Sequence, residues 1–223
     1  GMVKRLDEAF GRLLDALTSL DLRSRTIVLF TSDHGCHFRT RNTEYKRSLH
    51  DASIRVPTLL TGPGFNGGGQ VRELVSLVDL PPTLLDAAGL PVPGNLPGRS
   101  IRRLLQGERH DWPDEVFVQI SESEVGRAIR TKRWKYGVTA LAGNPWLDAG
   151  AVDYEETAIY DLDADPYELR NLIGFESHRA LSDSLQERLK DRMAAAGEVR
   201  PNIRPAPLRP SGQARVRTHE IAH

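Results

Sequence analysis

The stretch TIVLFTSDHG, residues 26–35, decides the fold class of this chain. Its first five residues form a short, continuous apolar run rich in β-branched side chains, which is typical of a buried parallel strand. Asp33, His34 and Gly35 follow within a few residues. Because α/β sheets present ligand-binding side chains just after the carboxyl ends of their strands, the stretch predicts an α/β sheet with a ligand site at this end.

An amphipathic helix precedes this strand. Its apolar residues recur at spacings of three and four, which places them on one stripe over about five turns. They are Val3, Leu6, Ala9, Phe10, Leu13, Leu14, Leu17 and Leu20. Further strands are expected at 54–60 and 74–78, and a helix is expected from Pro81 to Gly89. We therefore interpret residues 1–110 as an α/β domain with a partial mixed sheet flanked by helices.

The composition changes after residue 111. Short strands with tight polar connections predict a small antiparallel sheet, and they are expected at 115–120, 126–131, 133–138 and 157–161. Apolar residues spaced by four predict a helix over 177–195 that packs across this sheet. Residues 111–197 thus form a small α+β subdomain. Residues 198–223, rich in proline and arginine, predict a polar tail outside the fold.

The charge composition of the chain indicates which classes of partner it is not expected to bind. Thirty basic and thirty acidic residues give a formal net charge of zero, which predicts no binding to nucleic acid or to an anionic membrane. The basic strand around 127–135 is expected to have a solvated face. The single cysteine, Cys36, cannot form an internal disulfide. We find no apolar run long enough to span a membrane and no secretory leader, so the chain as it stands is expected to be cytoplasmic, although cysteine usage leaves the compartment undecided.

Asp33 and His34 are candidate metal ligands. A carboxylate oxygen and an imidazole nitrogen placed side by side can reach one divalent cation. Equally, the pair can belong to a polar turn in which Asp33 accepts hydrogen bonds from backbone amides and Gly35 adopts a positive φ. These residues alone leave both interpretations open.

The next segment, YKRSLHDASIRVP at 45–57, makes the pattern specific. It brings Lys46, then His50 beside Asp51, then an Arg-Val-Pro sequence that opens a strand. In this order of motifs the chain resembles sulfatases of the alkaline-phosphatase superfamily. Four later stretches extend the resemblance, at 75–85, 98–100, 128–136 and 159–172. It covers residues 3–195 and corresponds to the C-terminal half of such a protein.

The resemblance implies roles for individual residues. Asp33 and His34 would bind a divalent metal, with calcium as the first choice and manganese or zinc as alternatives. Lys46 would hold the sulfate oxygens or the bridging ester oxygen. His50 would hydrogen-bond the sulfate or protonate the leaving alcohol, or else only orient its neighbours. His37 lies in the loop between the two motifs and could contact the substrate.

Two further expectations concern geometry. The resemblance implies that Asp33, His34 and Lys46 converge at the carboxyl end of the strand that closes at residue 30. Arg55 is expected to be structural and to pair with Asp51.

Two parts of the sulfatase pattern are not found in these 223 residues. Sulfatases carry an early Asp-Asp pair of metal ligands and a Cys or Ser, in C-x-P-x-R or S-x-P-x-R, that is converted to the nucleophile formylglycine. Cys36 is followed by His37 and Phe38, so it does not fit. We therefore expect an N-terminal portion of comparable size and the formylglycine to be absent from this chain.

Three functional hypotheses follow. The chain is one piece of a sulfuric ester hydrolase, or a truncated and catalytically inactive sulfatase remnant that binds an anion, or a relative of phosphate and phosphonate monoester hydrolases. Its ligand is a sulfate ester or an inorganic anion. Without the missing portion, a strand edge and an apolar face would be exposed. A homodimer is the arrangement expected to cover them, with apolar residues of the first helix at its centre.

Overall fold

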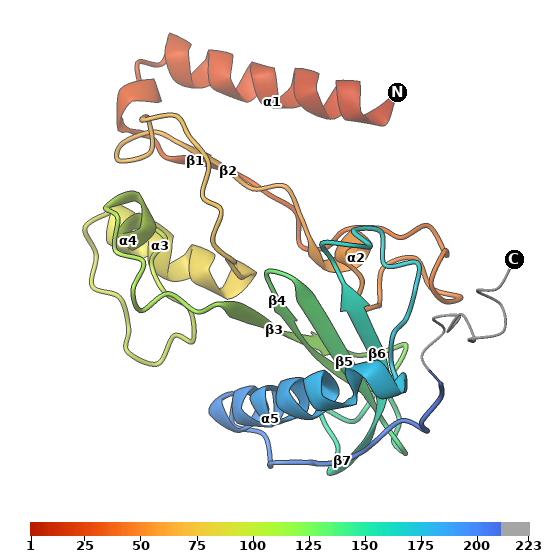
Figure 1. Cartoon of the computed structure of the whole chain (residues 1–223). Helices are drawn as coiled ribbons and strands as arrows, with labels where there is room; N and C mark the ends of the chain where they lie inside the picture. Colours follow the sequence, from red (N-terminus) through yellow and green to blue (C-terminus); the bar gives the residue numbers. More distant parts are fainter. Residues whose placement is uncertain (211–223) are drawn as a thin grey trace, which may run out of the picture. The chain divides into compact units, whose positions relative to one another are not determined.

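The computed structural model describes residues 1–210, and they fall into two compact units (Figure 1). The first comprises Gly1–Gly35 and Arg55–Trp112, and the second comprises Cys36–Ile54 and, among the described residues, 113–210. The break at Trp112 lies two residues after the boundary predicted from composition. Cys36–Ile54 was assigned to the first domain, but it belongs to the second unit. Within residues 1–210, no boundary between the units falls at 198.

The first unit contains helices and a two-stranded sheet. Helix α1 spans Met2–Ser19, as its apolar periodicity predicted. Strands β1 (Val28–Phe30) and β2 (Leu59–Thr61) are antiparallel, with Val28 opposite Thr61. Within residues 1–210 the only strand paired with β1 is β2, and β1 is half-buried. The buried parallel strand expected here is therefore not what the structure shows.

Two other expectations for this unit need correction. No strand forms at 74–78, because Ser76 and Asp79 make a reciprocal capping box around a 3-10 turn, Leu77–Asp79, that leads into α3 (Leu80–Ala87). The strand expected from residue 54 starts only at 59, because Asp51–Ile54 forms the helical turn α2. As expected, Gly89 ends α3 with a φ of 71°. A short helix, α4 (Arg102–Leu105), completes the unit.

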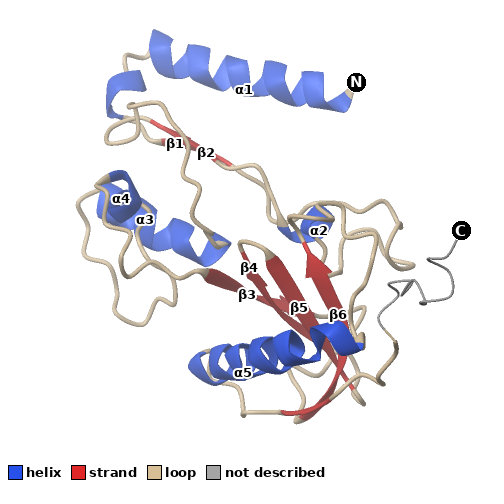
Figure 2. Ribbon diagram, in the orientation of Figure 1, coloured by secondary structure: helices blue, strands red, loops and turns tan. Residues whose placement is uncertain are grey.

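The second unit is built on a five-stranded mixed sheet in the order β3-β4-β5-β6-β7 (Figure 2). The strands are β3 (Glu115–Ile120), β4 (Gly126–Thr131), β5 (Trp134–Ala140), β6 (Asp153–Asp161) and β7 (Asn202–Arg204). The first four are antiparallel, as predicted, and β7 is parallel to β6. The mixed α/β fold class is confirmed, although the mixed sheet lies in this unit and the small antiparallel sheet in the first.

Strand β7 was not expected, because residues 198–223 were predicted to be a polar tail. Ile203 is buried and anchors β7 at the sheet edge. The rest of the predicted tail, residues 211–223, lies outside the described residues.

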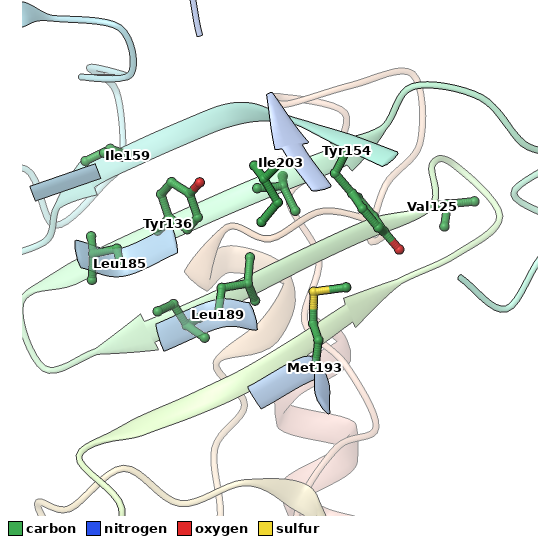
Figure 3. Packing of buried hydrophobic residues seen from close by; sticks show 10 residues of the cluster. Val125, Tyr136, Tyr154, Ile159, Leu185, Leu189, Met193 and Ile203 are labelled. Carbon is green, nitrogen blue, oxygen red and sulfur yellow. The ribbon is translucent and has the colours of Figure 1, made fainter. Parts of the chain in front are cut away.

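Helix α5 (Arg179–Ala195) covers one face of this sheet, as predicted. Its buried residues Leu185, Leu189 and Met193 pack against strand residues such as Ile129, Tyr136 and Ile159 (Figure 3). Because side chains alternate along a strand, the residues next to these strand positions face away from α5 and form a second buried cluster.

The segment Cys36–Ile54 covers that second face. Leu49 lies in a cluster with Ala128 and Ala158. Gly137 of β5 pairs with both alanines in register, Ala128 on one side and Ala158 on the other. Three small residues on adjacent strands thus form the surface on which Leu49 packs. This contact fixes the segment that carries Lys46 and His50 on the sheet.

Across residues 1–210, no helix combines the length and the apolar character that a membrane-spanning helix needs.

Candidate functional site

Asp33 and His34 lie just after β1 in the first unit. The Asp33 carboxylate accepts a hydrogen bond from the His34 amide (2.9 Å), and its other oxygen lies 3.5 Å from His34 Nε2. His34 Nδ1 lies 2.7 Å from the carbonyl oxygen of Gly35. Since a carbonyl only accepts, Nδ1 is the donor, and in the neutral imidazole Nε2 is then the unprotonated nitrogen that faces Asp33.

This geometry fits two ligands of one cation. Donor atoms 3.5 Å apart can share a metal ion at bond lengths of about 2.0–2.5 Å. The Gly35 carbonyl orients the imidazole, as partners of metal-bound histidines usually do. No group of three or more His, Cys, Asp or Glu side chains able to hold a metal ion occurs within residues 1–210. Asp33 and His34 would thus be two of the four or more ligands that such a cation takes.

The charge state of Asp33 suits this role. Desolvation raises the pKa of Asp33, but hydrogen bonds from the His34 amide and Ser32 and the nearby imidazole lower it below its ordinary value overall. The carboxylate is therefore ionised at neutral pH.

His50 lies in the second unit and is held on both sides. Its Nδ1 is 3.1 Å from the Ser48 hydroxyl and its Nε2 is 3.1 Å from the hydroxyl of Tyr160 on β6. Burial lowers the pKa of His50 to about 4, helped by the positive charges of Arg41 and Lys135 and opposed by Asp51. The imidazole is thus neutral at pH 7.

Lys46 lies in the same segment, between two anchored arginines. Arg41 donates hydrogen bonds to the carbonyl groups of Tyr167 and Glu168. Arg47 forms ion pairs with Glu44 and Glu122 and lies over the ring of Trp146. The Lys46 ammonium itself lies 5.6 Å from the centre of the Tyr45 ring.

His37 is the most buried of the predicted site residues. It is 2% exposed, and neither ring nitrogen has a hydrogen-bond partner among residues 1–210. Its backbone is fixed, since its amide donates to the carbonyl of Tyr45 (2.8 Å). A buried polar atom without a partner costs about 1–3 kcal/mol, so this imidazole is suited to bind water or a ligand.

A pocket of about 190 Å³ opens beside His50. Its lining residues are Arg41, Asn42, Ser48, Leu49, His50, Glu124, Thr157, Ala158 and Tyr160. Burial raises the pKa of Glu124, and the hydrogen bond from Thr139 offsets only part of this effect. Of the charged lining residues, Arg41 and Glu124 were not predicted, because no motif in the sequence distinguishes them from other loop residues.

A buried ionic network lies behind His50 and was also missed. Asp51 accepts hydrogen bonds from Lys135 (2.6 Å) and Arg130 (3.1 Å), and not from Arg55 as expected. Lys135 is 0% exposed, and Arg127 on β4 is 2% exposed and pairs with Glu198. Arg127 and Lys135 therefore do not lie on the solvated face predicted, because distant carboxylates neutralise them inside the unit, whereas Lys132 and Arg133 are exposed as predicted.

The structure brings the predicted residues together in two groups. Asp33 and His34 form one group in the first unit, and His37, Lys46 and His50 share one segment of the second. Convergence of Asp33, His34 and Lys46 stays a prediction.

Residues 43–195 match the family model described as N-sulphoglucosamine sulphohydrolase, C-terminal. The chain belongs to the sulfatase family. Arylsulfatase K of Mus musculus is 36% identical over an alignment 181 residues long, which covers 77% of this chain and 31% of the mouse protein. Arylsulfatase K of Homo sapiens is 35% identical, over 77% of this chain and 32% of the human protein. The sulfatase chain described here thus spans about a third of the length of these relatives.

Solved structures agree with this membership. The protein BT4656, in complex with its substrate D-glucosamine-2-N,6-O-disulfate, is 26% identical with a TM-score of 0.68, over 86% of this chain and 39% of that one. The phosphonate monoester hydrolase of Agrobacterium radiobacter is 26% identical with a TM-score of 0.69, over 87% of this chain and 40% of that one. Sulfatases and a phosphonate hydrolase thus share this fold.

Proposed function

We propose that this chain forms part of a sulfuric ester hydrolase and supplies half of its metal site together with groups that bind the sulfate. The observation that carries the proposal is the Asp33–His34 pair, whose donor atoms lie 3.5 Å apart just after β1. The sulfatase order of the motifs at 33–35 and 45–57 supports it.

Asp33 and His34 would bind a divalent cation, and calcium suits the carboxylate best. When bound, the cation would stabilise negative charge on the sulfate oxygens. His34 Nε2 would be its nitrogen ligand, because the Gly35 carbonyl holds the proton on Nδ1. The nitrogen ligand also leaves manganese or zinc as candidates.

Lys46 would bind the sulfate oxygens or the bridging ester oxygen. Breaking the ester bond increases negative charge on these oxygens, so a fixed ammonium group stabilises the transition state more than the bound substrate. The anchoring of Arg41 and Arg47 on either side limits the positions that Lys46 can take.

His50 would act as a hydrogen-bonding group. Because its pKa is about 4, the free protein holds His50 neutral at pH 7, and the imidazolium form that could protonate a leaving alcohol is scarce. A bound anion would raise this pKa. His37, with both ring nitrogens buried and without partners among residues 1–210, would contact the substrate or an ordered water.

The nucleophile of such an enzyme would come from outside these residues, because they contain no C-x-P-x-R or S-x-P-x-R sequence. A non-catalytic anion-binding remnant stays the alternative for the chain alone. Similarity to the phosphonate monoester hydrolase favours phosphonate or phosphate monoesters as a second class of substrate.

Titration with calcium, manganese and zinc by calorimetry tests the metal site. We expect binding of at least one cation that Asp33→Asn weakens about tenfold or more, because a carboxylate ligand is lost. Asp7→Asn, at an exposed position on α1, is the matched control and should bind as the parent does. Equal affinity in the parent and Asp33→Asn would contradict the proposal.

A further inference from the structure

Glu168 lies in the turn that follows β6, more than 100 residues along the chain from His37, Lys46 and His50. Its side chain is 2% exposed and its φ is 55°, in the left-handed region. Its amide donates to the carbonyl of Asp165 (3.0 Å), which closes the turn. The residue is therefore buried and held in an uncommon conformation.

The backbone of this turn holds one end of the segment that carries Lys46. Arg41 donates from Nη1 to the carbonyl of Glu168 (2.7 Å) and from Nη2 to the carbonyl of Tyr167. Arg41 also lines the pocket beside His50. The guanidinium is thus fixed by two carbonyl groups that the left-handed turn presents together.

The carboxylate of Glu168 holds the other end of the segment. Its Oε2 accepts a hydrogen bond from the backbone amide of Asp51 (2.7 Å), and its Oε1 accepts one from Lys135. Lys135 also donates to the Asp51 carboxylate (2.6 Å), which Arg130 contacts from the other side (3.1 Å). The negative charges of two carboxylates are therefore neutralised by the positive charges of Lys135 and Arg130 inside the unit.

The Asp51 end stays charged at neutral pH. Burial raises the pKa of Asp51, but its bonds to Arg130 and Lys135 outweigh burial and lower the pKa below its ordinary value. Breaking such a buried arrangement leaves an unpaired charge, which is costly. The network is thus a firm attachment for the start of α2.

We propose that Glu168 is a positioning residue, which fixes both ends of residues 41–51 and thereby the places of Lys46 and His50. The contacts that attach residues 41–51 do not depend on the proposed function. Only their role in placing Lys46 and His50 for sulfate binding rests on it. Between the two ends, Arg47 provides a third attachment through Glu122 and the hydroxyl of Ser123.

Hydrogen exchange tests the attachment. Glu168→Gln keeps the turn and the carbonyl but removes the charge that Lys135 requires. We expect protection of the amides in 41–51 to fall about tenfold or more, equivalent to about 1.4 kcal/mol in the opening free energy. Amides of β4 and β5 should keep most of their protection.

Glu156→Gln is the matched control. Glu156 is a buried carboxylate on β6 that accepts hydrogen bonds from Arg179, Tyr136 and Ser182 and contacts no residue of 41–51 through a described hydrogen bond. It should lower stability without a selective loss in 41–51. Arg41→Gln, which leaves no carboxylate unpaired, provides a second variant and should loosen the same segment. Unchanged protection of 41–51 in both Glu168→Gln and Arg41→Gln overturns the inference.

The pKa of His50, followed by NMR, separates positioning from a simple charge effect. The groups that face His50 are Ser48, Tyr160, Arg41, His37, Lys135 and Asp51. If the segment stays in place, loss of the Glu168 charge leaves Lys135 less compensated and the pKa of His50 falls below about 4. If the segment is released, solvation returns and the pKa rises toward 6.5. We expect the rise, and a fall overturns the inference.

A titration of the parent chain with inorganic sulfate distinguishes failure of the inference from failure of the proposed function. A sulfate-induced NMR shift at Lys46 that is lost in Glu168→Gln supports both. If the parent shows no shift at Lys46, the proposed function is contradicted, and the exchange of 41–51 still decides whether Glu168 positions the segment.

Discussion

Leu49 lies directly on the backbone of Gly137. A Cβ atom at position 137 would come within 2.5 Å of Leu49 Cδ2, closer than real Cβ atoms approach a neighbour. The absence of a side chain at Gly137 of β5 therefore allows Leu49, and with it the segment 36–54, to pack against the sheet. This contact links a core position to the place of Lys46 and His50.

Gly137→Ala should destabilise the second unit by about 1–3 kcal/mol, because the added methyl group forces Leu49 out of its place. Leu49→Ala should cost about 2–5 kcal/mol as a cavity mutation. Chemical denaturation of both variants and the double variant measures the coupling. Since the alanine at 49 makes room for the methyl group, we expect the double variant to be more stable than the sum predicts. Additive effects would show that the two side chains do not meet.

Lys135→Met should destabilise the chain by about 3–5 kcal/mol, because Asp51 and Glu168 lose the ammonium group that they share. Lys132→Met is the control on the same hairpin. Lys132 is exposed, so this variant should stay within about 0.5 kcal/mol of the parent. Denaturation midpoints measure both. A stable Lys135→Met variant would mean that the carboxylates find other partners.

The stability of the second unit should increase with pH between about 4 and 6.5. In this range the unfolded chain binds a proton at His50 that the folded chain does not, because the folded pKa is about 4 and the ordinary value is 6.5. The stabilisation by neutral His50 is thus complete above 6.5 and is lost as the pH falls to 4. The melting temperature of His50→Gln should depend less on pH in this window than that of the parent. Parallel curves for the two proteins would contradict the buried, neutral state of His50.

The chain alone should hydrolyse no aryl sulfate above background, with calcium or with manganese. The reason is chemical, since its 223 residues include no sequence that is converted to formylglycine. Release of 4-nitrophenol from its sulfate ester measures this. Turnover that disappears in Asp33→Ala would contradict the expectation, and Cys36→Ser and His50→Gln would then identify the reacting group.

The chain should form a homodimer at micromolar concentration, with a mass twice its 24.8 kDa. No residue of α1 is buried, and Leu6 and Leu13 on the helix and Leu20 at its C-cap are 54–67% exposed. They recur every seven residues, the spacing with which two helices pack along one seam. Light scattering should therefore show a dimer for the parent and for the control Thr18→Asp, and a monomer for Leu13→Asp. A monomeric parent would rule out this use of α1.

The helices and strands whose apolar residues recur with a clear period could be predicted from the sequence. Helices α1 and α5 and the antiparallel strands β3 to β6 carry apolar patterns that local geometry imposes. Strand β7 has one buried apolar residue, Ile203, and no period to reveal it. Strand β1 has the composition of a central parallel strand, but composition does not specify its partner.

The residues of the candidate site also differ in whether the sequence could predict them. Asp33, His34 and Lys46 stand in motifs whose order is characteristic. The partners of Asp51 are 79 to 117 residues away, and nothing near Arg130, Lys135 or Glu168 in the sequence indicates which carboxylates and cations will meet. The burial of Lys135 and Glu168 was missed for this reason, because a charged side chain is predicted to be exposed unless its partner is known.

Residues 41–51 cannot be attached to Glu168 until the ribosome has synthesised Glu168, well after it has made Asp51. The Asp51 amide and its carboxylate acceptor are separated by 117 residues. At about 5–20 residues per second, a ribosome needs roughly 6 to 23 s to reach Glu168 after it has made Asp51. During this interval Leu49 has no completed sheet to cover, and the whole of Arg55–Trp112 emerges in between. Residues 41–51 of the nascent chain therefore lack the Glu168 attachment throughout this interval.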